Sequence, residues 1–164
     1  MVILVMGVAG SGKSTVGQLL AHELGWSFAD ADDFHPPANI AKMAAGQPLT
    51  DADRAPWLAA LRAHIDTCLA RNENAVVACS ALKESYRRIL VPDTKRVPVV
   101  YLHGSRELLL SRISGRNGHY MKPAMLDSQL ATLEPPADVL SLDVTPPPDV
   151  LVAKIREALH LTSR

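Results

Sequence analysis

MGVAGSGKST, residues 6–15, is the stretch of sequence that decides the fold. It follows the apolar run VILV of residues 2–5 and precedes a segment whose apolar residues recur at helical spacing, so it is predicted to join a strand to a helix. Residues 7–14 fit the phosphate-binding motif G-x-x-x-x-G-K-[ST]. The glycines let the backbone curl until successive N–H groups point at phosphate oxygens, and the following helix adds its positive end. The stretch therefore predicts a nucleotide-phosphate site.

Two side chains of this loop have predicted roles of their own. Lys13 can reach the β- and γ-phosphates, and the Ser14 hydroxyl can ligate Mg²⁺. The alternative is a glycine-rich turn that contains Lys-Ser by chance, which is rare in a chain of this length. The other residues predicted to bind the nucleotide are Gly7, Val8, Ala9, Gly10, Ser11, Gly12 and Thr15.

Length and composition fit one globular domain, residues 1–164, with 48% hydrophobic residues for its core. Lys and Arg balance Asp and Glu at 17 each, which argues against a nucleic-acid-binding protein. Cys68 and Cys79 lie in apolar segments outside any metal-binding pattern, so we expect buried free thiols in a reducing compartment. The first strand starts at residue 2, leaving no room for a signal peptide, and no apolar run approaches membrane-spanning length. We therefore expect a cytoplasmic protein without a membrane partner.

Apolar runs alternate with helical patterns along the chain, which predicts an α/β fold of the three-layer phosphate-loop kinase type. It consists of a five-stranded parallel sheet with helices on both faces and a lid segment. In the long helix after residue 50, Asp53 is expected near the N-cap and Pro56 in the first turn. The expected strands are 2–6, 26–29, 75–79, 97–102 and 139–144, and the expected helices include 13–24, 105–113 and 123–133.

Two acidic residues follow the second predicted strand. Ligands of open parallel sheets gather at the carboxyl ends of the strands, and alternation puts Asp30 and Asp32 on one side of the chain. The third strand ends in Cys79 and Ser80 without an acid, so Asp30 is the best-placed carboxylate for the magnesium shell. Asp32 is then available to orient or deprotonate an acceptor hydroxyl, as a kinase for an alcohol needs. The alternative is an acidic loop that caps the next helix.

Basic residues form two further groups. Arg54, Lys83 and Arg87 lie near helix starts that follow strand-end loops, where they could bind an anionic acceptor; the alternative is solvated surface charge. The second group surrounds a glycine-broken segment of about residues 114–122, which is typical of a lid over transferring phosphates or of a plain solvated turn. The basic residues of this second group are Arg112, Arg116 and Lys122.

Motifs along essentially the whole chain resemble those of the gluconokinase family of phosphate-loop kinases, which is related to shikimate kinase. The elements DADDFHP, DRAPWL and CSALK are together more specific than the phosphate loop, which a large superfamily shares. The matching segments are MGVAGSGKS (6–14), DADDFHP (30–36), NIAKM (39–43), GQPL (46–49), DADRAPWL (51–58), CSALK (79–83) with Tyr86 and Arg87, and GHYMK (118–122) with ML (125–126).

The resemblance implies ATP- and Mg²⁺-dependent phosphorylation of D-gluconate at its terminal hydroxyl, giving 6-phospho-D-gluconate, by a homodimer with a lid. It implies catalytic roles for Lys13, Asp32 and Arg116, and metal ligation by Ser14 and Asp30. Arg112 and Arg116 would bind the nucleotide. The residues that would bind the substrate are Asp32, His35, Arg54, Lys83, Arg87 and His119.

Two other functions stay open at this point. The protein could phosphorylate another sugar acid or a shikimate-like acceptor, since the sequence does not display the pocket shape. It could also be a nucleotide-gated binding module without turnover, although the acidic pair argues against this. The unusual run of prolines at 146–148, where the adenine-side loop is expected, could alter the preference for the nucleotide base.

Overall fold

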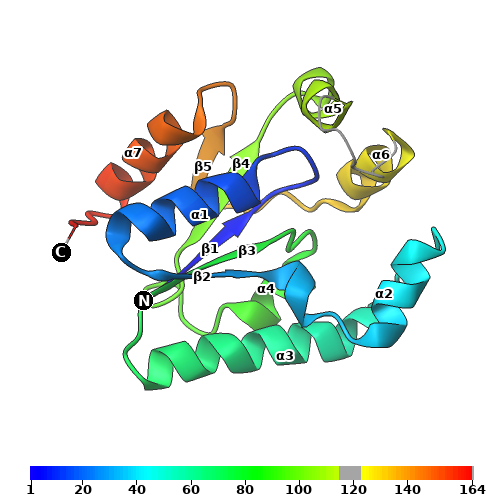
Figure 1. Ribbon diagram of the computed structural model, residues 1–164, viewed down its shortest axis with the longest axis horizontal. Coiled ribbons are helices and arrows are strands. Elements are labelled where there is room, and N and C mark those ends of the chain that lie inside the picture. Colours follow the sequence, from blue (N-terminus) through cyan, green and yellow to red (C-terminus); the bar gives the residue numbers. More distant parts are fainter. Residues whose placement is uncertain (115–122, 164) are drawn as a thin grey trace.

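The computed structural model describes residues 1–114 and 123–163, which form a parallel sheet between two layers of helices (Figure 1). The strand order is β2-β3-β1-β4-β5, so the predicted five-stranded parallel sheet with helices on both faces is confirmed. The strands are β1 (Val2–Met6), β2 (Ser27–Asp30), β3 (Ala75–Cys79), β4 (Val99–His103) and β5 (Leu140–Asp143). The helices are α1 (Lys13–Leu24), the 3₁₀ turn η1 (Ala31–Phe34), α2 (Pro37–Ala44), α3 (Asp51–Ala70), α4 (Glu84–Leu90), α5 (Arg106–Ser114), α6 (Pro123–Thr132) and α7 (Pro148–Ala158).

The central strand β1 is buried on both sides. Successive side chains of a strand point to opposite faces. Ile3 and Val5 therefore enter the hydrophobic cluster under α1 and α7, whereas Leu4 and Met6 enter the one under α3. A strand covered by helices on both faces needs a continuous apolar run, and residues 2–6 supply it.

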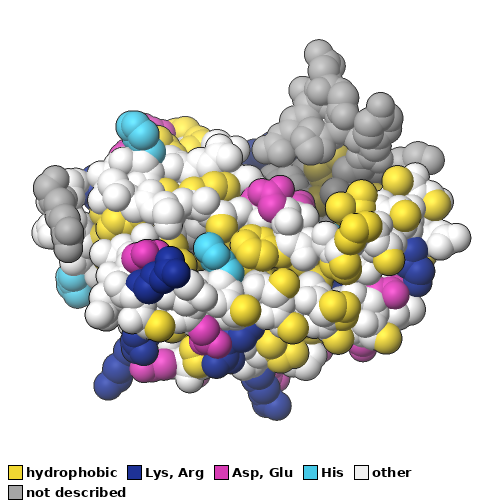
Figure 2. Space-filling view, turned by 60° about the horizontal axis from the view of Figure 1, so that its bottom comes forward, with side chains coloured by type: hydrophobic (Ala, Val, Ile, Leu, Met, Phe, Trp, Pro, Cys, Tyr) yellow, Lys and Arg dark blue, Asp and Glu magenta, His cyan; other side chains and the backbone are white. Residues whose placement is uncertain are grey.

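Parallel strands all end at one edge of the sheet, which is the edge that carries the loops of the predicted site. The β1–α1 loop, η1 and α2 lie at this edge, as do α5 and α6 (Figure 1). The indole N–H of Trp57 donates a 2.7 Å hydrogen bond to the Ala31 carbonyl and so fixes η1 against α3. On the face that carries α3, hydrophobic side chains gather at the right of the view (Figure 2), and the α2 residues Ile40 and Met43 are among the exposed ones.

Helix α3 begins earlier than its sequence predicts. Thr50 is the N-cap, and it forms a capping box with Asp53: the Thr50 hydroxyl accepts from the Asp53 N–H, while the Asp53 carboxylate accepts from the Thr50 N–H. Asp53 lies near the N-cap, as predicted, but the prediction of Pro56 in the first turn is wrong, because the earlier start of the helix puts Pro56 inside it. The carbonyl of Ala52, which loses its helical partner to Pro56, belongs to an exposed residue that water can reach.

Both cysteines are buried free thiols, as predicted. Burial within the sheet raises the pKa of Cys79 to about 12, so this thiol is protonated at neutral pH. No helix in the described ranges is long and apolar enough to cross a lipid bilayer.

Candidate functional site

The loop between β1 and α1 has the shape that phosphate binding requires. Gly10 and Gly12 adopt φ angles of 78° and 81°, which residues with a side chain rarely adopt. Gly12 caps α1 without a side-chain hydrogen bond, and no acidic residue stands in the first turn of the helix. The N–H groups and the positive end of α1 are therefore available to an anion.

A buried hydroxyl under this loop supports the same interpretation. Ser11 is 1% exposed, and within residues 1–114 and 123–163 its Oγ has no hydrogen-bond partner. The loop closes tightly over it, because a Cβ at Gly7 would lie 2.4 Å from the Ser11 Oγ. A buried polar atom without a partner costs free energy, and such costs are typical of loops at functional sites.

Ser14 and Asp30 meet beside the loop. The Ser14 hydroxyl donates to Asp30 Oδ2 at 2.8 Å, and the other carboxylate oxygen accepts the N–H of Asp32 at 3.0 Å. A hydroxyl and a carboxylate oxygen form a donor set that suits a hard cation such as Mg²⁺, which keeps much of its water shell. Among the described residues, no group of three His, Cys, Asp or Glu side chains is placed to hold a metal ion.

Asp32 lies close to Asp30, although not through strand alternation. The chain turns into η1 after Asp30, and the Asp30 side chain caps that turn, so the alternative reading of an acidic helix cap also holds for Asp30. Asp32 reaches solvent, but displacement of water by nearby protein and the negative charge of Asp30 raise its pKa. The positive charge of Lys13 partly offsets this rise. A carboxylate with a raised pKa is a better proton acceptor near neutral pH.

His35 stacks on Trp57 with the ring centroids 4.5 Å apart and the planes 11° apart. Asn39 donates one amide hydrogen to the Asp53 carbonyl, which fixes the orientation of the amide, and lies 3.2 Å from His35 Nδ1. His35 Nδ1 therefore accepts, and the ring proton sits on Nε2. Desolvation lowers the pKa of His35, with the charge of Asp32 raising it and that of Arg54 lowering it. His35 is thus a neutral hydrogen-bond donor whose pKa responds to the charges of both groups.

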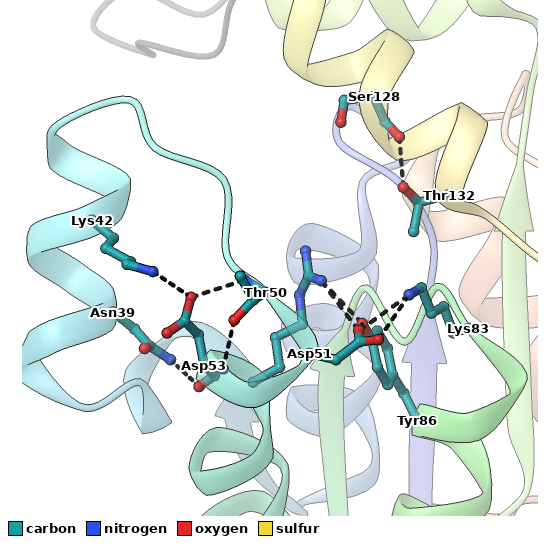
Figure 3. Close-up of polar contacts among 10 residues, drawn as sticks. Asn39, Lys42, Thr50, Asp51, Asp53, Lys83, Tyr86, Ser128 and Thr132 are labelled. Carbon is teal, nitrogen blue, oxygen red and sulfur yellow. Dashed lines mark hydrogen bonds and ion pairs between the residues drawn. The ribbon is translucent and has the colours of Figure 1, made fainter.

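Arg54 and Lys83 come together around Tyr86 and Asp51, as the close-up shows for the labelled residues (Figure 3). Tyr86 donates to the Asp51 carboxylate at 2.5 Å and accepts from Arg54 at 3.0 Å. The Lys83 ammonium donates to both Asp51 oxygens, at 3.1 and 3.3 Å. The hydrogen bonds from Tyr86 and Lys83 lower the pKa of Asp51. Two cations share one carboxylate, which leaves one excess positive charge for an anionic ligand.

Arg87 does not join this group. Arg87 is 8% exposed, and its guanidinium donates to the backbone carbonyls of Ala81, Leu82 and Glu134. Burial lowers the pKa of Arg87, although the nearby Glu134 partly offsets this. In this structure Arg87 therefore braces the loop after β3 against the segment that leads to β5, and its substrate-binding role stays a prediction.

The remaining predicted residues lie around α5. Arg112 donates to the Val144 carbonyl at 2.5 Å, near the end of β5 and the proline run that follows it. Arg116, Lys122 and His119 fall outside the described residues, so their predicted roles are untested.

Sequence reasoning missed three residues that the site uses. Tyr86 and Asp51 connect the two predicted cations, and both stood in the quoted motifs without a role. Gln129 of α6 accepts a hydrogen bond from the Ala9 N–H of the phosphate loop at 2.8 Å. These pairs are 32 to 120 residues apart, and no local pattern signals such contacts.

Comparison with known proteins identifies the family. A family model described as "Shikimate kinase" matches residues 9–135. The chain is 46% identical to the gluconokinase of Gluconobacter oxydans, covering 93% of this chain and 88% of that protein, and 44% identical to a probable gluconokinase of Mus musculus, covering 96% and 97%. The chain belongs to the gluconokinase family.

A solved structure agrees with this family assignment. The crystal structure of a gluconokinase from Sinorhizobium meliloti superimposes with a TM-score of 0.81 at 42% identity, covering 99% of this chain and 97% of that one. The predicted kinship with gluconokinases and shikimate kinase is confirmed, and so is the phosphate-loop kinase fold. As a member of this family, the protein is a phosphotransferase.

Proposed function

We propose that this protein transfers the γ-phosphoryl group of ATP to the terminal hydroxyl of D-gluconate, giving 6-phospho-D-gluconate. The observation that carries the proposal is that His35 feels the charges of both Asp32 and Arg54. A proton acceptor and a cation near one polar side chain suit an acceptor with a hydroxyl at one end and a carboxylate at the other. The similarity to gluconokinases over most of the chain supports D-gluconate as that acceptor.

The phosphate loop would bind and polarise the nucleotide. Lys13 supplies a fixed positive charge to the transferring group, and the N–H groups at the start of α1 hold the other phosphate oxygens. Ser14 and Asp30 would hold Mg²⁺ through their side-chain oxygens, which lie 2.8 Å apart. When bound, Mg²⁺ neutralises negative charge on the phosphates.

Asp32 would orient the acceptor hydroxyl and take up its proton. Its raised pKa suits this role, because a base works best when its pKa lies near the working pH. His35 offers its Nε2 proton to a substrate oxygen while Trp57 and Asn39 hold the ring in place. Arg54 and Lys83 would bind the substrate carboxylate, for which a guanidinium is the natural partner.

The acceptor is tested by measuring ADP release with D-gluconate, shikimate, other sugar acids and no acceptor. We expect release to depend on D-gluconate, and phosphorus NMR of the product to show a phosphomonoester on the terminal carbon. If only a different acid supports turnover, the protein is still a kinase, but D-gluconate is not its substrate. Nucleotide binding without turnover on any acid would instead indicate a binding module.

The lid, the oligomeric state and the cellular location are also part of the proposed function. We propose a single domain with a lid at about residues 114–122, in which Arg116 contacts the phosphates and His119 the substrate. Residues 115–122 of this segment lie outside the described residues. We also propose a homodimer, which light scattering on the purified protein would test, and a cytoplasmic location, which fractionation would test.

A further inference from the structure

The phosphate loop contacts a helix that is far away in the sequence. The Ala9 N–H donates a 2.8 Å hydrogen bond to the side-chain carbonyl of Gln129, on α6. Figure 1 shows the β1–α1 loop extending toward α5 and α6. Residues 9 and 129 are 120 positions apart, so only the tertiary fold brings them together.

The loop itself leaves this N–H without an acceptor. The Ser11 N–H donates to the Val8 carbonyl at 3.2 Å, and Gly10 has a positive φ, which together form a tight turn over residues 8–11. In such a turn the N–H of the second residue, Ala9, has no acceptor inside the turn. Ala9 is 7% exposed, so water has little access to that N–H. Gln129 supplies the acceptor that the buried donor needs.

Helix α5 holds the same turn from another side. A Cβ at Gly10 would lie 2.6 Å from the Leu109 carbonyl and 3.0 Å from the Ile113 side chain. The backbone of the turn is therefore packed directly against α5 while its Ala9 N–H is bonded to α6. The middle of the loop cannot shift without breaking one of these two contacts.

We propose that Gln129 is a positioning residue for nucleotide binding. Its carbonyl keeps the Ala9 peptide turned toward α6, and the other loop N–H groups thereby stay aligned with the phosphate oxygens. Without this acceptor, the buried Ala9 N–H regains a hydrogen bond only by turning toward a phosphate oxygen or water. That rotation pulls the loop out of its phosphate-binding shape. The inference rests on the proposed nucleotide site and adds to it a residue outside the motif.

The first test replaces Gln129 by a side chain of similar length without an acceptor. In Gln129→Met we expect the affinity for a non-hydrolysable ATP analogue with Mg²⁺, measured by calorimetry, to fall about tenfold. The KM for ATP should rise accordingly, while the KM for the acceptor changes little, because Gln129 contacts the nucleotide loop. Unchanged ATP affinity in a folded Gln129→Met protein overturns the inference.

The second test keeps the acceptor and adds a charge. Gln129→Glu can still accept from Ala9, so the protein should fold even if Gln129→Met does not. Its carboxylate would lie beside the phosphates and weaken ATP binding more than ADP binding, because ATP carries about one more negative charge. Ala131→Glu is the matched control, since it adds the same charge at an exposed position of α6.

The comparison of the two glutamate variants decides the matter. A selective loss of ATP affinity in Gln129→Glu, with ATP affinity retained in Ala131→Glu, shows that position 129 acts on the bound nucleotide, as the inference requires; the loss in Gln129→Met then assigns that action to the acceptor. Equal behaviour of the two variants overturns it while the nucleotide site stands. Failure of the unaltered protein to bind ATP overturns both the site and the inference.

Discussion

Asp30 and Asp32 are two residues apart, yet their surroundings give them different chemistry. Asp30 bonds the Ser14 hydroxyl and the Asp32 N–H, so both of its oxygens have partners beside the phosphate loop. Asp32 has the raised pKa, caused by desolvation and by the charge of Asp30. At the scale of single residues, the first carboxylate is suited to a cation and the second to a proton.

The division of labour between the two carboxylates is testable by paired substitutions. Asp32→Asn should lower kcat about 10²–10⁴-fold with little change in ATP affinity, because it removes the proton acceptor. Asp30→Asn should weaken the binding of Mg²⁺–ATP, because it removes a metal ligand. The activity of this variant should recover in part at high Mg²⁺ concentration. The measurements are kcat and the apparent affinities for ATP, Mg²⁺ and D-gluconate. If high Mg²⁺ restores the activity of Asp32→Asn instead, the two roles are exchanged. If kcat falls only a few-fold in both variants, the base lies elsewhere.

Lys13 carries the next prediction at this scale. Lys13→Ala should lower kcat by several orders of magnitude, because the transferring phosphoryl group loses its fixed positive partner. The fold should survive, since Lys13 is not part of the hydrophobic core. Circular dichroism and steady-state kinetics check both statements. Near-normal turnover in folded Lys13→Ala would contradict the nucleotide site.

At the scale of elements, the cations near the start of α3 and in α4 differ in whether a ligand can reach them. Lys83 is partly exposed and bonds Asp51 across the two elements, so a ligand can reach it. Arg87 is buried and bonds three backbone carbonyls. The capping box of Thr50 and Asp53, with Lys42 bound to Asp53 at 2.7 Å, holds the start of α3 in place.

Alanine substitutions should therefore separate binding from stability. Lys83→Ala should raise the KM for D-gluconate about tenfold and change the melting temperature little, because exposed ion pairs stabilise weakly.

Arg87→Ala should lower the free energy of unfolding by about 2–4 kcal/mol, because carbonyls in a buried region lose their donor. Thermal and denaturant unfolding measure this, with exposed Arg88→Ala as the control. A large KM effect without a stability loss in Arg87→Ala would instead place Arg87 at the substrate.

At the scale of the whole molecule, the site reduces the stability that the core provides. Two apolar clusters on the faces of the sheet hold the domain together. Asp32 acts in the opposite direction, since its pKa is higher in the folded protein than in the unfolded chain. At a pH below the ordinary Asp pKa, Asp32 is protonated in the folded protein and in the unfolded chain, so it does not change the free energy of unfolding. As pH rises through the raised pKa, the folded state loses stability relative to the unfolded chain.

This linkage predicts a pH-dependent gain in stability on removal of the charge. Asp32→Asn should melt at a higher temperature than the unaltered protein at neutral pH, and the difference should shrink as pH falls toward about 4. Calorimetry between these pH values measures it. Asp33→Asn, which removes the same charge one residue along, is the control. An equal gain in both variants would assign the effect to general surface charge.

The sequence by itself determined the sheet and the place of the site. The strand at residues 2–6 is continuously apolar because helices cover both faces, and G-x-x-x-x-G-K-S marks where its loop binds phosphate. Strands and helices follow one another along the chain in the expected α/β pattern, and strand ends lie within two residues of their predicted positions. Asp30 and Asp32 were predictable as site candidates because they directly follow a strand at the carboxyl edge.

Only the tertiary structure decided how the side chains at this edge are partnered. Arg54, Lys83 and Arg87 are equivalent in the sequence as basic residues near helix starts, but Arg87 turns inward to three carbonyls while the other two meet at Asp51 and Tyr86. Gln129 reaches Ala9 from 120 residues away. Local patterns follow from the periods of single strands and helices, whereas these hydrogen bonds depend on how separate elements pack. A buried donor takes whichever acceptor the packed fold brings within reach.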